Sequence, residues 1–391
     1  MPTSAKERYT VLDALRGLAL LGIALANFSE FGLWTFLSAE QQAAMPTAEA
    51  DRWVRFAQYM LVDGKFYTIF SLLFGVGFSL ILMRHSRGLF VRRMFILVAI
   101  GFLHLMFVWN GDILLLYAVG GLLLTLFVRW SDRVLLCTAL GLILLPVGLE
   151  VMGWSLAQPL YERWWAVATA NGITEDNFTT WLRDAHTYPE MFAFLQQGAV
   201  ERMWEFADGH RLPKVLGLFM LGYLIGKHRL YARLEELTLK ELLRCILLLS
   251  LVLSGVYAWS ATQGHPWGDA VHAVLYALSV VPLGLCYIMI LCLSYTRKPK
   301  SVIFTLLAAP GRMALTNYIS QSLIGILLFY GIGFGVGTHL GLVHIELIAV
   351  GVFLLQIVLS HLWLRRFRFG PLEWLWRMLT YGRLLNLGLS S

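Results

Sequence analysis

Long apolar runs separated by short polar stretches dominate this chain. Runs of about twenty apolar residues without strict alternation favour helices over strands, and such a helix is long enough to cross a bilayer. Within lipid, each spanning segment must satisfy its own backbone hydrogen bonds. The pattern therefore predicts an all-α integral membrane protein, a bundle of about ten transmembrane helices over residues 11–37, 65–83, 94–109, 113–128, 134–154, 212–226, 246–262, 270–294, 302–330 and 345–364.

The composition agrees with this class. Hydrophobic residues make up 58% of the 391 positions and charged residues only 14%, whereas a soluble globular chain carries about 25% charge. The four cysteines form no CxxC pair and lie in or beside apolar runs, so we expect small apolar packing residues rather than disulfides or a metal site. The chain contains no Walker loop, Rossmann glycine pattern or HExxH pair.

Positive charge predicts the orientation of the bundle. Lysine and arginine concentrate in cytoplasmic loops, and 21 of the 31 fall in alternate loops that begin with the N-terminal segment. Both termini are therefore expected in the cytoplasm. Orientation and anionic lipid account for the net charge of +7, so we expect membrane lipids and no nucleic acid as partners. The oligomeric state stays open.

Two segments outside the predicted spans have their own character, although residues 1–391 read as a single membrane domain. Residues 155–210 are rich in Trp, Glu and Asp, which predicts a polar loop or helical segment on the outer face. Residues 370–391 begin with Gly-Pro and alternate aromatic with basic residues, which predicts an interfacial amphipathic tail.

The first apolar run carries polar residues that no loop explains, namely Asp13, Arg16 and Asn27. Arg16 and Asn27 are eleven residues apart, so they fall within roughly 20° of one another on a helix. A charge in hydrocarbon costs on the order of 3 kcal/mol or more, so this stripe must face protein, water or a ligand. Arg16 could hold a phosphate or form a structural ion pair with Asp13. Asn27 could donate to a carbonyl or oxyanion, or bond to another helix.

His104 is the best candidate for a catalytic base. Its imidazole lies in an apolar run near the predicted outer face, and the pKa of histidine is closest to working pH. Asp112 follows in a short turn and could orient the imidazole or cap the next helix. A histidine with a purely structural role is the alternative.

Four further residues could contact a substrate or donor. Lys65 opens the second run, where it either snorkels to the interface or contacts substrate. Pro310 and Gly311 interrupt the ninth run just before Arg312, which predicts a discontinuous helix that aims positive charge at an anionic group. In the same run, Asn317 and Gln321 lie four residues apart on one face, typical of a buried interface or a substrate path.

Five blocks of sequence resemble the YeiB family of bacterial inner-membrane proteins. They are LDALRGLALLGIALAN at 12–27, KFYTIFSLLFGVGF at 65–78, GFLHLMFVWNGDILLLYAVGGL at 101–122, GRMALTNYISQSLIG at 311–325 and GPLEWLWRMLT at 370–380. The first block is in turn similar to the first span of transmembrane acyltransferases such as the heparan-α-glucosaminide N-acetyltransferases, in which Arg, ten residues and then Asn recur. Residues 28–40 contain no histidine to match the catalytic one of those enzymes.

The resemblance implies an acyltransferase in the bacterial inner membrane that moves an acyl group from cytoplasmic acyl-CoA to an outer-face glycan, sugar or lipid headgroup. No tightly bound cofactor is expected, and acyl-CoA would be a co-substrate. Catalysis would fall to His104, Asn27 and Asp112, and donor or substrate binding to Arg16, Lys65, Arg312, Asn317 and Gln321. The alternative is a transporter or flippase for an amphipathic small molecule, which would use the same polar stripe as its path.

Overall fold

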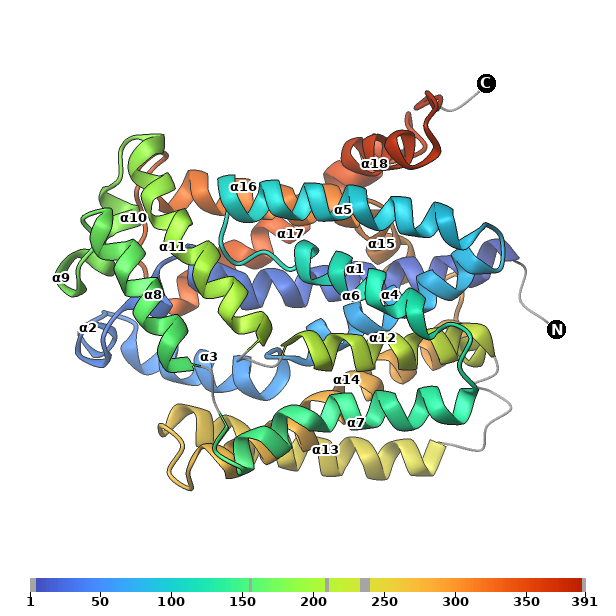
Figure 1. The fold of residues 1–391 in the computed structure, drawn as a ribbon, viewed down its shortest axis with the longest axis horizontal. Helices are drawn as coiled ribbons and strands as arrows, with labels where there is room; N and C mark the ends of the chain where they lie inside the picture. The colour runs from blue at the N-terminus through green and yellow to red at the C-terminus, as the bar shows by residue number, and fades with distance from the viewer. Residues whose placement is uncertain (1–4, 155–156, 208–210, 233–239, 389–391) are drawn as a thin grey trace.

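The computed structural model describes residues 5–154, 157–207, 211–232 and 240–388, and its regular structure there is helical throughout (Figure 1). The main helices are α1 (Ala5–Phe31), α3 (Ala48–Leu61), α4 (Lys65–Leu82), α5 (Arg87–Phe107), α6 (Leu114–Phe127), α7 (Asp132–Val151), α8 (Ala157–Ala170), α11 (Tyr188–Ala207), α12 (Arg211–Lys227), α13 (Lys240–Thr262), α14 (Asp269–Arg297), α15 (Val302–Arg312), α16 (Ala314–Phe329), α17 (Leu342–Leu364) and α18 (Pro371–Tyr381). The short helices are α2 (Ala39–Ala43), α9 (Glu175–Phe178) and α10 (Trp181–Asp184).

Each apolar run predicted to span the membrane contains a helix. Within the described residues, seven stretches of helix could cross a bilayer by length and composition, and α15 with α16 would make an eighth if this bent pair is one span. Two predicted spans are shorter, since α6 has 14 residues and α12 has 17. The all-α, multi-pass membrane fold is therefore confirmed, while the count of ten spans and the cytoplasmic termini stay predictions.

Glycines let the helices of the bundle approach one another closely. A Cβ at Gly75 of α4 would lie 2.2 Å from the carbonyl oxygen of Phe219, and one at Gly222 of α12 would lie 2.1 Å from that of Leu72. Only glycine permits such contact between backbones, which is a common way for membrane helices to pack. Helices α4 and α12 are thus packed closely against each other.

The predicted discontinuous helix is present, but its break falls at Met313, directly after Arg312 rather than before it. Helices α15 and α16 meet at an angle of 77°, and Pro310 lies in the last turn of α15. Gly311 brings α15 against α1, because a Cβ there would lie 1.8 Å from the carbonyl oxygen of Asp13. This contact fixes Arg312 beside the first turns of α1.

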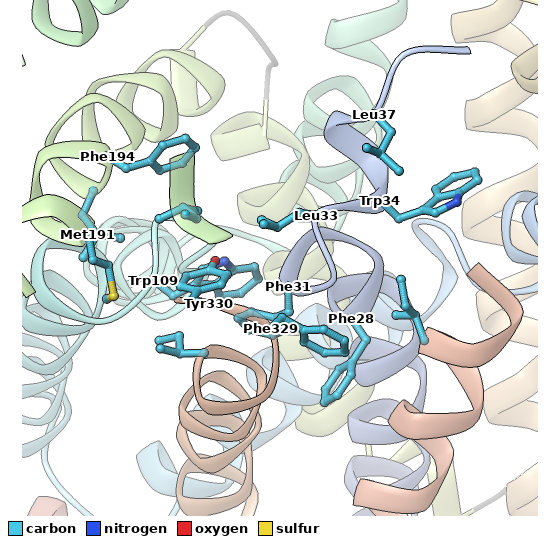
Figure 2. Packing of buried hydrophobic residues seen from close by; sticks show 14 of the residues in the cluster. Phe28, Phe31, Leu33, Trp34, Leu37, Trp109, Met191, Phe194, Phe329 and Tyr330 are labelled. Atoms are coloured by element: carbon cyan, nitrogen blue, oxygen red, sulfur yellow. The ribbon is translucent and has the colours of Figure 1, made fainter. Parts of the chain in front are cut away.

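The segment predicted as an outer-face loop or helical segment folds into α8 to α11, which cover the end of the bundle where α1 finishes (Figure 1). Buried aromatic side chains join this cover to the bundle (Figure 2). The rings of Phe31 and Trp109 lie 4.3 Å apart, and Phe194 of α11 belongs to the same cluster. Residues 155–156 and 208–210 of the predicted segment lie outside the described residues. We call this region the covered end and the opposite one, where α1 begins, the N-terminal end.

The predicted interfacial tail contains α18, which begins with proline and lies at the N-terminal end (Figure 1). Trp376 donates through Nε1 to the carbonyl of Arg93, whose guanidinium lies 3.5 Å from the centre of the same indole ring. The carboxylate of Glu373 accepts hydrogen bonds from the amides of Leu315 and Thr316, at 2.6 and 3.1 Å. Helix α18 thereby caps the first turn of α16. Residues 389–391 of the tail lie outside the described part of the chain.

Candidate functional site

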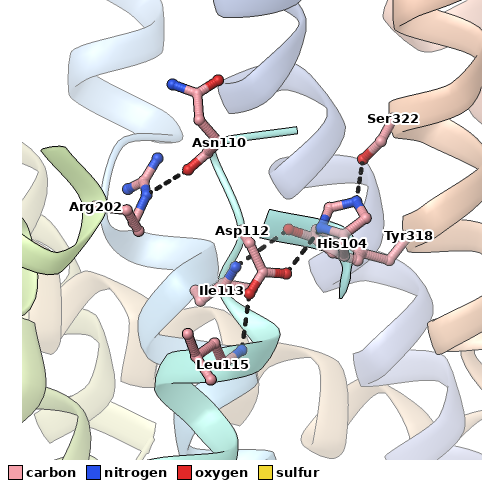
Figure 3. Close-up of polar contacts among 8 residues, drawn as sticks. All are labelled: His104, Asn110, Asp112, Ile113, Leu115, Arg202, Tyr318 and Ser322. Atoms are coloured by element: carbon pink, nitrogen blue, oxygen red, sulfur yellow. Dashed lines mark hydrogen bonds and ion pairs between the residues drawn. The ribbon is translucent and has the colours of Figure 1, made fainter. Parts of the chain in front are cut away.

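A buried hydrogen-bonded row joins three residues from α5, α16 and the turn before α6 (Figure 3). The Nδ1 atom of His104 lies 2.8 Å from Oδ2 of Asp112, and its Nε2 atom lies 3.0 Å from Oγ of Ser322. The three residues are between 1% and 2% exposed. Because the carboxylate accepts the proton on Nδ1, Nε2 is free to accept the proton of the serine hydroxyl.

Asp112 makes both contacts that its position in the sequence suggested. While Oδ2 faces His104, Oδ1 accepts a hydrogen bond of 2.8 Å from the amide of Leu115 in the first turn of α6. A carboxylate held in this way at the start of a helix is also favoured by the helix dipole. The hydrogen bond from Leu115 therefore fixes the position of the Asp112 carboxylate, which orients the imidazole of His104.

The turn that carries Asp112 is held from the covered end. Arg202 of α11 is buried and donates from Nε to the carbonyl of Asn110 over 2.8 Å (Figure 3). Gly198, one turn earlier on α11, lets that helix touch Asn110, since a Cβ at Gly198 would lie 2.4 Å from the Cβ of Asn110. The outer segment thus positions the site as well as covering it.

Ser322 was not a candidate on sequence grounds. The polar pattern of this run favours Asn317 and Gln321, which share one face of α16, whereas Ser322 lies on another face. A signal was present, because Tyr318 and Ser322 are also four residues apart and so share a face. Without His104 opposite, nothing distinguished that face from ordinary packing.

A cavity of about 500 Å³ opens at the N-terminal end and runs between α1, α4, α5, α16 and α18. Most of its wall is apolar, with Phe70, Phe74 and Leu97 among the lining residues. Five arginines line it against two acidic residues, Asp13 and Glu373, and these arginines are Arg16, Arg84, Arg93, Arg312 and Arg377. The cavity therefore combines positive charge with a hydrophobic interior.

The deep part of this cavity reaches the residues that adjoin the histidine. Ile113 and Tyr318 both line the cavity, and the amide of Ile113 donates to Oη of Tyr318 over 3.3 Å. The ring of Tyr318 lies 5.4 Å from the imidazole of His104. Figure 3 shows Tyr318 beside His104 and Ile113 directly after Asp112. We call Ile113 and Tyr318 the cavity floor.

Two predicted donor-binding residues line the cavity. Arg16 pairs with Asp13 across 2.6 Å, so the structural ion pair exists, and both residues also face the cavity. Arg312 lines the same space and donates from one guanidinium nitrogen to the carbonyl of Arg368 over 3.3 Å. The ion pair therefore does not remove Arg16 from reach of a ligand.

Asn27 and Lys65 do not line this cavity. Asn27 is partly buried, and its side chain has no hydrogen-bond partner within the described ranges. Lys65 is fully buried and does not snorkel to the interface. Its Nζ donates to the carbonyl of Tyr59 over 2.6 Å and lies 5.0 Å from the ring centre of Tyr257. The structure therefore does not bring either residue to the floor.

Asn317 and Gln321 belong to the buried interface that was the alternative to a substrate path. Asn317 donates to the carbonyl of Pro310 and to Ser360, at 3.1 and 3.0 Å. Gln321 donates to Gln356 of α17 over 2.9 Å. These bonds hold α16 against α15 and α17, and neither residue lines the cavity.

Two charged residues of α18, Glu373 and Arg377, line the cavity and are largely removed from solvent. Burial raises the pKa of Glu373, although the hydrogen bonds from Thr316 and Leu315 partly oppose that shift. Burial also lowers the pKa of Arg377. No group of three or more His, Cys, Asp or Glu that could hold a metal occurs within the ranges the structure describes.

Comparison with known proteins finds uncharacterized bacterial relatives that match nearly the whole chain. Residues 225–383 match the model of a family described as "Protein of unknown function (DUF418)". Uncharacterized protein YxaH of Bacillus subtilis (strain 168) is 30% identical over 403 residues, which cover 97% of this chain and 96% of that protein. Uncharacterized protein YeiB of Escherichia coli (strain K12) is 30% identical over 396 residues, which cover 96% of each. An uncharacterized 39.9 kDa protein of Bacillus acidopullulyticus is 30% identical over 98% of this chain and 96% of its own length. The chain belongs to the YeiB family.

Proposed function

We propose that this protein is a membrane-embedded acyltransferase that moves an acyl group from acyl-CoA to a hydroxyl or amine of a sugar, glycan or lipid headgroup. One observation carries the proposal. An arginine-lined cavity with apolar walls includes Ile113 and Tyr318 among its lining residues, and the ring centre of Tyr318 lies 5.4 Å from that of His104. A phosphate-bearing thioester and a general base would thus approach the same point from two sides.

The cavity suits the chemistry of acyl-CoA. Arginine binds phosphate oxygens in a bidentate manner, so Arg16, Arg312 and Arg377 could hold the phosphates near the opening. The apolar wall suits the pantetheine arm and the acyl chain, which carry few charged groups. The thioester would then lie at the inner end of the cavity, next to Tyr318.

His104 is suited to take a proton from the acceptor. The carboxylate of Asp112 fixes the tautomer that leaves Nε2 unprotonated and stabilises the imidazolium that forms. General base catalysis of this kind contributes about 10²–10⁴-fold to a rate. A buried setting strengthens the effect, since fewer water dipoles screen the charges.

The two ends of the bundle suit two different substrates. The positive-charge pattern predicts that the N-terminal end faces the cytoplasm, where acyl-CoA is made, and that α8 to α11 face outward. The acceptor would approach from this covered end. Because the relatives come from bacteria, we place the enzyme in the bacterial inner membrane.

Transport is the second candidate, and the bend between α15 and α16 favours it. Broken helices near the middle of the membrane form substrate sites in many transporters. The 77° bend lies beside the cavity, and Arg312 is at its edge. A carrier would bind an amphipathic anion there without any acyl transfer.

Thermal unfolding of the purified protein in detergent, with and without acetyl-CoA, tests the proposal. A ligand that binds only the folded state at 100 times its Kd stabilises it by about 2.7 kcal/mol, so the transition should move upward. The shift should be lost in Arg16→Gln and Arg312→Gln. It should persist in Arg52→Gln, which changes an exposed arginine on α3.

A second measurement follows release of free CoA while glycan, sugar and lipid acceptors are added in turn. Acceptor-dependent release that is lost in His104→Gln would support the enzyme. If several acyl-CoAs neither shift the transition nor release CoA with any acceptor, the acyltransferase proposal is wrong. Uptake into proteoliposomes would then be the assay to pursue.

A further inference from the structure

Ser322 is a helical serine whose hydroxyl bonds outside its own helix, as the hydroxyls of Ser71, Ser254 and Ser260 also do. A serine inside a helix commonly donates back to a carbonyl three or four residues earlier. That arrangement occurs at Ser29, Ser79, Ser279 and Ser320. The hydroxyl of Ser322 instead meets Nε2 of His104 on α5, 218 residues away in sequence. Among the described residues it makes no bond to its own helix.

The direction of this hydrogen bond follows from the carboxylate on the far side of the ring. A carboxylate Oδ2 of Asp112 can only accept at its pairing with Nδ1, so Nδ1 carries a proton. In the neutral imidazole Nε2 is then unprotonated and accepts from the hydroxyl of Ser322. A serine hydroxyl that donates to an imidazole, itself oriented by a carboxylate, is the arrangement that activates a serine for attack.

Ser322 also has a route to the cavity. It lies one helical turn beyond Tyr318 on the same face of α16, and Tyr318 lines the floor. The serine is 1% exposed and is not among the residues that line the cavity, so its hydroxyl does not reach the cavity in this structure. A rotation of the Tyr318 side chain, without movement of a helix, is the smallest change that would admit a thioester.

We propose that Ser322 is the nucleophile of this site and carries the acyl group as an ester between the donor and the acceptor. The proposal rests on the acyltransferase function proposed above and specifies a two-step route with a covalent intermediate. Direct transfer from donor to acceptor within one ternary complex is the alternative that the experiments must exclude.

The chemistry balances without any further reactant. Oγ of Ser322 attacks the thioester carbonyl, a C–O bond forms, and the C–S bond breaks. The serine proton passes to Nε2 of His104 and then to the departing sulfur, so CoA leaves as a thiol. In the second step the acceptor hydroxyl or amine attacks the serine ester, His104 takes the acceptor proton and returns it to Oγ, and the acyl product leaves.

Tyr318 is placed to assist both steps. Its Oη accepts from the amide of Ile113, and within the described residues its own hydroxyl hydrogen has no acceptor. That hydrogen could donate to the carbonyl oxygen as negative charge develops on it. Hydrogen bonds to a developing oxyanion contribute up to about 10²–10³-fold in rate.

The first test is isolation of the acyl-enzyme. Purified protein is mixed with acetyl-CoA without an acceptor, quenched in acid and examined by intact mass and peptide mapping. We expect one acetyl group on the peptide that contains Ser322, none in Ser322→Ala, and full labelling in Ser320→Ala, whose hydroxyl belongs to the same helix but bonds to Asn317. Ser322→Cys should carry the group as a hydroxylamine-sensitive thioester.

Steady-state kinetics and a donor-independent probe complete the test. Parallel double-reciprocal lines for acetyl-CoA and acceptor, and loss of about 10³-fold or more of the rate in Ser322→Ala, would agree with the covalent route. Acceptor-dependent transfer that survives in Ser322→Ala, or that shows intersecting lines with no trapped ester, would overturn it and leave the acyltransferase function intact.

If none of several acyl-CoAs binds or reacts, the acyltransferase function fails, and a fluorophosphonate probe then decides the role of the serine. Labelling of Ser322 that is lost in His104→Gln would support an activated nucleophile acting on another acyl donor. Folded protein that stays unlabelled, with unfolding transitions matching wild type, would overturn the inference.

Discussion

Nδ1 of His104 and Oδ2 of Asp112 lie 2.8 Å apart, although one residue belongs to the last turn of α5 and the other to the turn that precedes α6. Both side chains are almost wholly buried, at 2% and 0% exposure. A buried carboxylate without a partner is strongly unfavourable, so the pair supports the hairpin between the two helices. The same contact sets the tautomer of the imidazole, which links the local fold to the proposed chemistry.

Asp112→Asn separates these two roles. The amide oxygen can still accept from Leu115 and cap α6, so we expect the thermal unfolding transition to fall by only a few degrees. The imidazole, however, loses the carboxylate that orients it and stabilises its charged form. We expect acyl transfer to fall by about 10²–10⁴-fold with little change in acetyl-CoA affinity. Transfer within threefold of wild type would mean that Asp112 acts only as a cap.

Gly311→Ala should destabilise the contact between α15 and α1. The new Cβ would lie 1.8 Å from the carbonyl oxygen of Asp13, so backbone must move. We expect a loss of about 1–3 kcal/mol, together with weaker acetyl-CoA binding, because Arg312 and Arg16 lie beside this contact. Gly351→Ala on α17 is the control, since a Cβ there meets nothing within 4 Å. Equal transitions for the two variants would contradict the packing argument.

The sequence predicted the fold well where the physics is local. Twenty-residue apolar runs specify helices by themselves, and a break near Pro310 and Gly311 was visible because proline removes a backbone donor. It could not predict the angle of that break or the lengths of α6 and α12. The angle and the helix lengths depend on the neighbouring helices that pack around them, and so does the number of spans.

The candidate site was predictable only within one hairpin. His104 and Asp112 are eight residues apart, so a short turn was enough to suggest that they meet. Ser322 comes from a helix more than 200 residues later, and no local pattern specifies that approach. Lys65 shows that a local pattern can also mislead. Its position at a helix start suggested snorkelling, whereas Tyr257 of the distant helix α13 covers it.

Glu373→Gln should loosen α18 from the bundle. Its carboxylate accepts from the amides of Leu315 and Thr316 and from the hydroxyl of Thr316. A neutral amide makes weaker bonds and loses the interaction of the charge with the start of α16, a change of about 1 kcal/mol. We expect faster tryptic cleavage after Arg377, measured by mass spectrometry. Glu49→Gln, which changes an exposed glutamate of α3, should be cleaved at the wild-type rate.

Glu201 on α11 should make the stability of the covered end depend on pH. Burial, reinforced by the negative charge of Glu205, raises its pKa to about 7, while Arg202 acts in the opposite direction. A glutamate in the unfolded chain has a pKa near 4.3. Between these two values the folded state binds more protons than the unfolded state. The free energy of unfolding should therefore decrease as the pH rises from about 4 to 7, by at most about 4 kcal/mol, and level off above that range.

Comparison of thermal unfolding at pH 5 and pH 8 checks this sign. Wild type should lose more stability over the interval than Glu201→Gln, whose amide does not titrate. Glu175→Gln, an exposed position on α9 in the same segment, should keep the wild-type dependence. The groups that face Glu201 from other helices, Glu30 of α1 and Arg211 of α12, are present in all three proteins, so their contributions cancel. If wild type loses no more stability between pH 5 and pH 8 than Glu201→Gln does, the carboxyl of Glu201 is ionised throughout this interval. The hydrogen bond from Arg202 to the carbonyl of Asn110 would then have to keep α11 in place despite the buried negative charge of Glu201.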